Sequence, residues 1–238
     1  MNLKIVSNIR LFFPESLSTN LTLKLDKSQS HYLIKVMRMN IDKNFSLFNQ
    51  NGEWEARITK ITKGIVEFLI TKKIRSNDNE KEIWLAFAPI KLNYLNLMIQ
   101  KATELGVSKF LPILTERTIV RKINEKRLNK IIVEASEQSN RLKVPKLEEI
   151  VKLDNFLKFN QKTNIIFGDL NTNNNKFNIK NTEPLCILIG PEGDFTTKER
   201  EKILKLKNII PLKINENILR AETAAISMIS IIAFNLLS

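Results

Sequence analysis

Apolar and polar residues alternate along short runs in the first 72 residues, a pattern typical of strands that bury one face. The clearest runs are "NLTLKL" and "NFSLFNQNGEWEARITKITKGIVEFLITK". Asn51-Gly52 and Lys63-Gly64 divide the second run, and Asn-Gly predicts a hairpin because both residues tolerate positive φ. One helix, "DKSQSHYLIKVMRM", interrupts the strands, with Asp26 or Ser28 as its N-cap. The pattern predicts a small β-barrel over residues 1–72.

The charged segment Lys73–Glu82 is predicted to be a linker, because after it the pattern changes to strand, helix, strand. The expected strands are "IWLAFAPI", "KFLPILT", "TNIIFG", "LCILIG" and "IIPLKI". The expected helices are "LNYLNLMIQKATELG", which Gly106 ends as a left-handed cap, "NEKRLNKIIVEASEQSNR", and one that begins near Thr196. An Asn-rich loop spans Asn171–Asn181. This alternation predicts a parallel sheet with helices on its faces over residues 83–238.

Ligands of parallel sheets bind beyond the carboxyl ends of the strands, so three loops are candidates for a site. They lie at Gly168, at Gly190–Gly193 and at Asn215–Leu219. The second loop, "GPEG", joins a strand to a helix with Thr-x-x-Glu capping-box spacing. It predicts a tight turn with exposed amides, in which a side chain at Gly190 would block a ligand. Glycines that serve only the turn remain the alternative.

The C-terminal stretch "NENILRAETAAISMISIIAFNLL" predicts a helix that is apolar almost all round and therefore buried on most faces. Arg220, Glu222 and Thr223 are polar exceptions at its start. Polar groups are costly at a buried position unless they are paired or functional. Arg220 and Glu222 are therefore either an internal ion pair or part of a site.

Composition excludes several classes of protein. With 238 residues and 43% hydrophobic residues the chain can bury a core, and its longest apolar stretch is too short for a membrane span. The N-terminus has charges inside its apolar part and does not resemble a signal peptide, so we expect a cytoplasmic protein. A single cysteine, Cys186, and a single histidine, His31, argue against a disulfide, a metal site and a Ser-His-Asp hydrolase. We expect Cys186, inside "LCILI", to fill the core.

The net charge of +13 predicts a polyanionic partner such as nucleic acid. The chain is also rich in Lys, Asn and Ile, so part of the excess can be compositional. Arginine matches phosphate geometry better than lysine does. The expected phosphate contacts are therefore Arg10, Arg38, Arg117 and Arg141, each with a solvated surface charge as the alternative.

Five segments resemble a known family: "HYLIKVMRM", "QKATELGVSKFLPILTERT", "EASEQSNRLKVP", "LIGPEGDFT" and "ILRAETAAI". They are similar to the ribosomal small-subunit methyltransferase E family, the uridine-N3 methyltransferases of the SPOUT superfamily. The resemblance implies a PUA-like RNA-binding barrel followed by a SPOUT domain with a deep trefoil knot that binds S-adenosylmethionine. It also implies a homodimer that acts on small-subunit ribosomal RNA. Asp194 and Asn215 stand where the family usually has glycine.

The same resemblance implies roles for the site residues. Arg220 would stabilise the uracil anion, and Glu222 would accept the N3 proton or hold Arg220 in place. The residues expected to hold the cofactor are Phe167, Gly168, Ile189, Gly190, Pro191, Glu192, Gly193, Leu212, Ile214, Asn217, Ile218 and Leu219. A non-catalytic RNA-binding assembly factor, or a methyltransferase for another RNA atom, remains an alternative.

Overall fold

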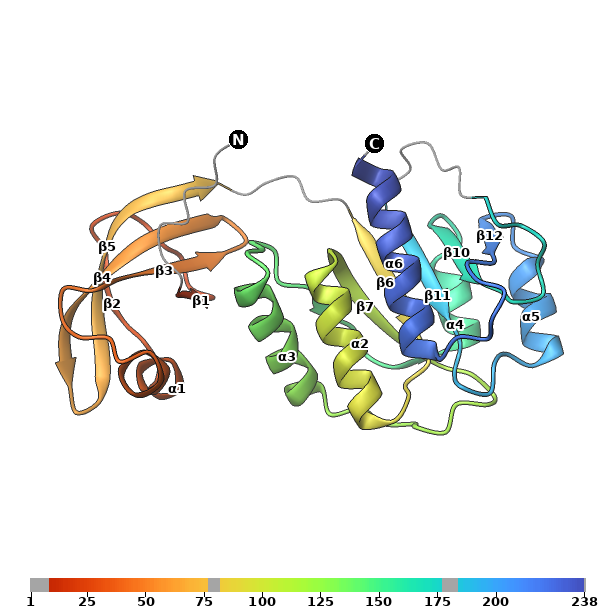
Figure 1. The fold of residues 1–238 in the computed structure, drawn as a ribbon, viewed down its shortest axis with the longest axis horizontal. Helices are drawn as coiled ribbons and strands as arrows, with labels where there is room; N and C mark the ends of the chain where they lie inside the picture. The colour runs from red at the N-terminus through yellow and green to blue at the C-terminus, as the bar shows by residue number, and fades with distance from the viewer. Residues whose placement is uncertain (1–8, 77–81, 177–183, 238) are drawn as a thin grey trace. The chain divides into compact units, whose positions relative to one another are not determined.

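The computed structural model describes residues 9–76, 82–176 and 184–237. The chain forms two compact units (Figure 1). Met1–Asn79 and Ser136–Val144 make up the first unit, and Glu80–Ala135 and Pro145–Ser238 make up the second. A short stretch from the middle of the sequence therefore belongs to the N-terminal unit.

The first unit contains a five-stranded sheet in the order β1-β3-β4-β5-β2. Its strands are β1 (Arg10–Phe12), β2 (Thr22–Lys24), β3 (Asn44–Asn49), β4 (Gly52–Thr62) and β5 (Ile65–Ser76). The antiparallel pairs β3–β4 and β4–β5 confirm the two predicted hairpins. The second hairpin turns at Lys63 and Gly64, both with positive φ, whereas Gly52 already belongs to β4. Strand β5 reaches Ser76, so the predicted linker begins as strand, and its residues 77–81 lie outside the described part of the chain.

The predicted N-terminal helix has two parts. Helix α1 (Lys27–His31) begins where the carboxylate of Asp26 accepts the Gln29 N–H at 2.8 Å, as the capping pattern predicts. The chain continues as a π-helical turn, η1 (Tyr32–Val36), and Arg38 then takes a positive φ of 53°. Helix and sheet enclose an apolar core in which the rings of Phe45 and Phe68 meet edge to face at 5.7 Å.

Arg10 joins the segment Ser136–Val144 to this sheet. Its guanidinium donates to the carbonyl oxygens of Ser136, Glu137 and Arg141 at 3.2, 2.9 and 2.9 Å, and to the carboxylate of Glu53 at 2.9 Å. It also lies 4.2 Å from the centre of the Phe48 ring. Burial lowers the pKa of Arg10, and the carboxylate of Glu53 opposes that shift. Arg10 therefore satisfies the end of α3 (Glu125–Gln138), whose last carbonyls have no partner within the helix.

The second unit contains a parallel sheet in the order β12-β10-β11-β6-β7-β8, and β9 pairs with β7. The strands are β6 (Ile83–Phe87), β7 (Val107–Leu114), β8 (Lys146–Leu147), β9 (Val151–Lys152), β10 (Asn164–Gly168), β11 (Leu185–Ile189) and β12 (Ile209–Leu212). Every pair among them is parallel, which confirms the predicted sheet. Strands β8 and β9, each of two residues, are too short for a periodic pattern to reveal.

Helices cover both faces of this sheet. On one face α2 (Leu92–Glu104) and α6 (Ala221–Leu237) lie side by side (Figure 1). On the other face, side chains of α4 (Leu153–Phe159) and α5 (Thr197–Leu204) pack into one core with Phe167 and Leu188. Gly106 ends α2 with a φ of 102°, as predicted.

Two further predictions for the second unit concern the Asn-rich loop and the trefoil knot. Residues 177–181 of the predicted Asn-rich loop lie outside the described residues. The trefoil knot stays a prediction. Within the described ranges, no helix is long and apolar enough to cross a membrane.

Candidate active site

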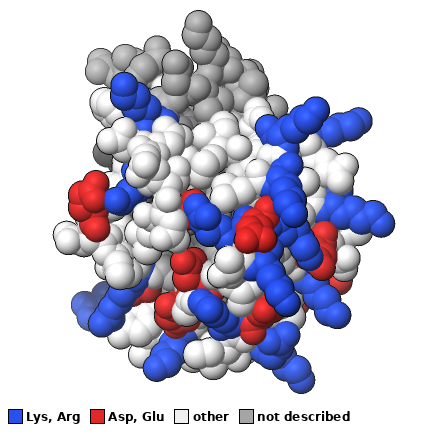
Figure 2. All heavy atoms as spheres, turned by 90° about the vertical axis from the view of Figure 1, so that its right-hand side faces the viewer, with Lys and Arg blue, Asp and Glu red and all other residues white. Residues whose placement is uncertain are grey.

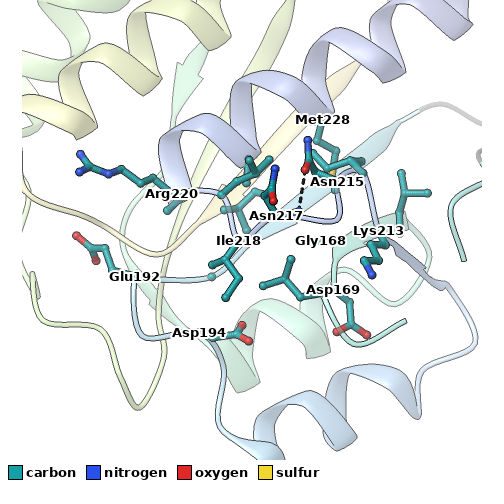
Figure 3. Close-up of a pocket in the computed structure, with 18 of the residues that line it drawn as sticks. Gly168, Asp169, Glu192, Asp194, Lys213, Asn215, Asn217, Ile218, Arg220 and Met228 are labelled. Atoms are coloured by element: carbon teal, nitrogen blue, oxygen red, sulfur yellow. Dashed lines mark hydrogen bonds between the residues drawn. The ribbon is translucent and has the colours of Figure 1, made fainter. Parts of the chain in front are cut away.

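The three predicted loops meet at one cavity of about 280 Å³ in the second unit (Figure 3). They follow β10, β11 and β12, three neighbouring parallel strands, so their carboxyl ends open at the same edge of the sheet. The start of α6 forms a further wall. The lining residues are Gly168, Asp169, Leu170, Ile189, Gly190, Pro191, Glu192, Asp194, Leu212, Lys213, Ile214, Asn215, Asn217, Ile218, Leu219, Arg220, Ala221, Ala224 and Met228.

Most residues predicted to hold the cofactor line this cavity. The exceptions are Phe167, which is buried beneath it, and Gly193, which lies in the loop without lining the cavity. Sequence reasoning missed the acidic residues Asp169 and Asp194 and the α6 residues Ala224 and Met228. The four-residue spacing of Ala224 and Met228 puts them on one helix face, but the sequence pattern assigned that face only to the core.

Gly190 is required by packing inside the protein. A Cβ atom added there would lie 2.7 Å from the ring of Phe195, which is closer than real Cβ contacts allow. Phe195 is buried and meets Phe167 edge to face, with ring centres 5.3 Å apart. A side chain at Gly190 would therefore displace Phe195, and blocking of a ligand by that side chain stays a prediction.

The left-handed residue of the loop is Asp194, with a φ of 57°. Its N–H donates to the carbonyl of Pro191 at 2.9 Å, and its carboxylate accepts the Phe195 N–H at 2.8 Å. Aspartate tolerates this conformation better than most residues because its short side chain bonds locally. Asn215 differs from Asp194 because its φ is not positive. Its side-chain oxygen accepts the Asn217 N–H at 2.8 Å. Both replacements of glycine thus close a turn through their own side chains.

The charged side chains that line the cavity differ in whether an opposite charge forms an ion pair with them. Asp169 is buried and accepts two hydrogen bonds from Arg200 of α5, at 3.0 and 2.7 Å, which raise the pKa of Arg200. Lys213 pairs with Glu216. Glu192 and Asp194 are exposed and, among the described residues, have no ion-pair partner within 4 Å. Glu192 and Asp194 therefore contribute two exposed carboxylates to a cavity that Lys213 and Arg220 also line.

Arg220 and Glu222 do not pair with each other in the part of the chain that the structure describes. Arg220 is exposed at the side of the cavity where Glu192 also lies (Figure 3). Its guanidinium donates to the hydroxyl of Tyr94 in α2 at 3.1 Å and lies 5.3 Å from the ring centre. Glu222 is buried in the first turn of α6 and does not line the cavity. Sequence reasoning missed Tyr94, because no local pattern links α2 to the start of α6.

The predicted RNA contacts fall into two groups. Arg10 and Arg141 are buried within the first unit, and Arg10 is fully engaged there, so neither guanidinium is presented to a phosphate. Arg38 and Arg117 are exposed. Figure 2 shows one face of the molecule, where Lys and Arg are spread out with Asp and Glu between them. This face alone does not define a basic track.

Cys186 lies in the middle of β11 and is buried, as predicted. Burial raises the pKa of its thiol to about 12. A thiol in this state is a poor nucleophile, since the thiolate is the reactive form. Within the described ranges, no group of three or more His, Cys, Asp or Glu could hold a metal ion.

Two family models match the chain and identify it as an RNA methyltransferase with an accompanying PUA domain. Residues 77–233 match the family described as RNA methyltransferase domain, and residues 25–71 match the RNA methyltransferase PUA domain. The ribosomal RNA small subunit methyltransferase E of Rickettsia conorii is 32% identical over 228 residues, which cover 93% of each chain. Its counterpart in Buchnera aphidicola from Acyrthosiphon pisum is 31% identical over 231 residues, 93% of this chain and 91% of the relative. The chain belongs to the ribosomal RNA small subunit methyltransferase E family.

Solved structures agree with this assignment. The ribosomal RNA small subunit methyltransferase E of Neisseria gonorrhoeae, solved bound to S-adenosyl methionine, has a TM-score of 0.88 at 27% identity and covers 95% of this chain and 97% of its own. A methyltransferase from Legionella pneumophila, solved with the same cofactor, has a TM-score of 0.84 at 28% identity, with the same coverage. Both similarities extend over the two units.

Proposed function

We propose that this protein transfers a methyl group from S-adenosylmethionine to N3 of a uridine in small-subunit ribosomal RNA. The observation that carries the proposal is the cavity formed by the loops after β10, β11 and β12, in a chain of the methyltransferase E family. Two solved relatives of high structural similarity bind this cofactor. The proposed substrate lies in the cytoplasm, and we assign the protein to that compartment.

The residues of the cavity fit such a cofactor. Its walls are largely apolar, with Ile189, Leu212 and Met228 among them, and a few polar groups stand at the mouth. The exposed carboxylates of Glu192 and Asp194 favour a cationic ligand, and the donor supplies its methyl group from a sulfonium cation. Asp169 is held by Arg200, so we assign it a structural part in shaping the floor.

Arg220 is the proposed electrostatic catalyst. The N3 atom of uracil carries a proton that must leave before or during methyl transfer, and the negative charge then spreads to O2 and O4. An arginine at the cavity edge stabilises that charge, and contact with Tyr94 fixes its direction. Glu222 lies outside the lining, so we assign it the orienting role at the first turn of α6. Alignment of the two reacting atoms supplies much of the remaining rate.

Variants of the two residues test these roles. We expect Arg220→Ala to lose methyl transfer while S-adenosylmethionine binding, measured by calorimetry, is kept. Glu222→Gln should lower the rate by a factor that does not change with pH. A rate that recovers as the pH rises would instead make Glu222 the proton acceptor.

Arg38 is the proposed RNA contact of the first unit. It is exposed, and it follows the π-helical turn Tyr32–Val36, in which Tyr32 and Lys35 are also exposed. Exposed cations and an exposed aromatic ring on one segment suit the phosphate and base contacts of single-stranded RNA. Arg38→Gln should weaken RNA binding and make the dependence of log affinity on log salt shallower.

We also propose that the protein is a homodimer. Exposed apolar side chains occur on α2, at Leu92, Tyr94 and Leu97, and on the neighbouring α6, at Ile231 and Phe234. Such side chains on adjacent helices suit an interface between two copies. Light scattering should report roughly twice 27.6 kDa. Leu97→Glu should yield monomers, and a wild-type monomer at micromolar concentration would contradict the proposal.

The direct test is methyl transfer to small-subunit RNA, free and in assembled subunits, followed by mass spectrometry of the nucleosides. We expect 3-methyluridine that depends on both the protein and S-adenosylmethionine. A different methylated nucleoside would correct the target atom. Cofactor binding without any transfer, or no cofactor binding, would favour a non-catalytic assembly factor.

A further inference from the structure

Arg117 lies in the segment after β7, residues 115–118, which approaches the loop Gly190–Gly193. We infer that Arg117 is a positioning residue, which holds this loop in the shape that binds the methyl donor. This inference rests on the proposed function, because it assigns a task to the same cavity. It differs from the phosphate contact that the sequence alone predicts for Arg117.

The first observation is a direct contact. The Nη1 atom of Arg117 donates to the carbonyl oxygen of Gly193 at 2.8 Å. A Cβ atom added at Gly193 would lie 3.5 Å from Cβ and 3.6 Å from Cδ of Arg117, which is ordinary van der Waals contact. The stem of Arg117 thus covers Gly193 while its head binds the carbonyl.

A second contact ties the same segment to the far end of the loop. The N–H of Glu116 donates to Oε1 of Glu199 at 2.8 Å, and Oε2 of Glu199 accepts the Thr196 N–H at 3.0 Å. Glu199 is buried and Glu116 is exposed, so this bridge is partly buried. Residues 116 and 117 therefore hold residues 190–196, which we call the pocket loop, at Gly193 and near Thr196, the N-cap of α5.

Hydrogen bonds within residues 115–118 make this segment rigid. The side-chain oxygen of Thr118 accepts the N–H of Thr115 at 2.9 Å, and their hydroxyl groups lie 2.8 Å apart. Both residues are buried. The pocket loop, by contrast, exposes Glu192, Gly193 and Asp194. Because ordering an exposed loop costs free energy on binding, an external support at Gly193 improves cofactor affinity.

The experiment compares Arg117→Met with Arg121→Met. Methionine keeps an apolar stem against Gly193 but cannot donate to its carbonyl. Arg121 is a matched control, because it lies in the same connection, is exposed, and, among the described residues, donates a hydrogen bond only to the Thr118 carbonyl, at 3.3 Å. Without RNA, we expect Arg117→Met to bind S-adenosylmethionine about three- to tenfold more weakly, the range for one lost hydrogen bond. Arg121→Met should bind as the unmutated protein does, and Arg117→Lys should recover part of the loss.

Hydrogen exchange supplies a readout that does not depend on the cofactor. The amides of residues 190–196 should exchange faster in Arg117→Met than in Arg121→Met, because Asp194 and Phe195 depend on the closed loop for their bonds. If the unmutated protein binds no S-adenosylmethionine, the proposed function fails and the exchange rates still test the support. Equal exchange in the two variants would overturn the inference. Unchanged cofactor affinity with weaker RNA binding would overturn it as well and make Arg117 a phosphate contact.

Discussion

Gly190 is the position in the pocket loop where the backbone has least room. An added Cβ would meet the Phe195 ring at 2.7 Å, and that ring is fixed against Phe167. We expect Gly190→Ala to lower the free energy of unfolding by about 1 to 3 kcal/mol, the usual cost of overpacking. Thermal unfolding measures this change.

Gly193→Ala is the control for that substitution. Its added Cβ would make only ordinary contacts with Arg117, and the backbone there is not left-handed, so stability should hardly change. Equal stability of the two variants would contradict the packing account of Gly190. Loss of cofactor binding in Gly190→Ala without loss of stability would support direct blocking of the ligand.

Cys186 should make stability depend on pH in alkaline solution. The thiol is buried with its pKa raised from 9.0 to about 12, so between these values the unfolded chain releases a proton that the folded chain keeps. Unfolding is therefore favoured as the pH rises, by about a factor of ten in the equilibrium constant per pH unit in that window. Below pH 9 the contribution is fully present.

Urea unfolding of the unmutated protein and of Cys186→Ala at pH 8 and pH 10.5 tests this dependence. Alanine cannot ionise, so the variant should lose less stability between the two conditions. Other titrating groups affect both proteins alike and cancel in the comparison. An identical loss in both proteins would mean that Cys186 reaches solvent in the native state.

At the scale of single residues, the sequence predicted which loops line the cavity better than it predicted the conformation and contacts of each residue. The loops at Gly168, Gly190 and Asn215 follow from strand order, and all three line the cavity. The left-handed position could not be assigned, because "GPEGD" offers two glycines and an aspartate, and the chain uses Asp194. Tyr94 as the partner of Arg220 is a contact across 126 residues, which no periodicity encodes.

Helix α5 shows how one side chain can fix an element and its surroundings. Thr196 and Glu199 form the predicted capping box, and the other oxygen of Glu199 bonds to the N–H of Glu116. We expect Glu199→Ala to lower the free energy of unfolding by about 1 to 3 kcal/mol, since it removes a cap and leaves the Glu116 N–H, whose hydrogen bond is partly buried, without this partner.

Glu201→Ala is the matched control for Glu199→Ala, because Glu201 lies in the same helix and is exposed. Thermal unfolding of the two variants should separate them clearly. Equal melting temperatures would show that solvent replaces both bonds of Glu199 without cost.

Element prediction succeeded where the hydrophobic pattern was long. The longer strands and α2, α3 and α6 follow from their apolar patterns, and α5 follows from its capping box, whereas β1, α4, β8 and β9 are short and were missed. The turn η1 was predicted as ordinary helix, because a single π-helical turn of five residues is too short to change the apolar pattern of the sequence around it. Local patterns thus define the sheet but not the irregular segments around it.

At the scale of the whole molecule, the two units are not consecutive in sequence. Ser136–Val144 belongs to the first unit through Arg10, and its Leu142 is buried. No composition change marks this segment, and so residues 83–238 were predicted to form one domain. Residues 136–144 join the first unit because the side chain of Arg10, 126 residues before Ser136, donates to carbonyl oxygens at the end of α3.

Arg10→Met therefore tests the architecture in the full chain. Three carbonyl oxygens lose a buried donor, and Glu53 keeps only Arg75, so we expect a loss of about 3 kcal/mol in the free energy of unfolding. Hydrogen exchange should rise in residues 136–144. Because none of these residues lines the cavity, S-adenosylmethionine affinity should stay within about twofold.

A truncated protein that begins near Ser76 tests the same dependence of residues 136–144 on the first unit, because it removes all contacts with residues before Ser76. It lacks Arg10 and Glu53, so residues 136–144 should exchange as fast as an unstructured peptide, while the cavity residues remain present. RNA binding should weaken, with a shallower salt dependence, because the basic groups of the first unit are absent. RNA affinity and salt slope equal to those of the full chain would deny the first unit any part in RNA binding. Unchanged protection of residues 136–144 would show that this segment folds without Arg10.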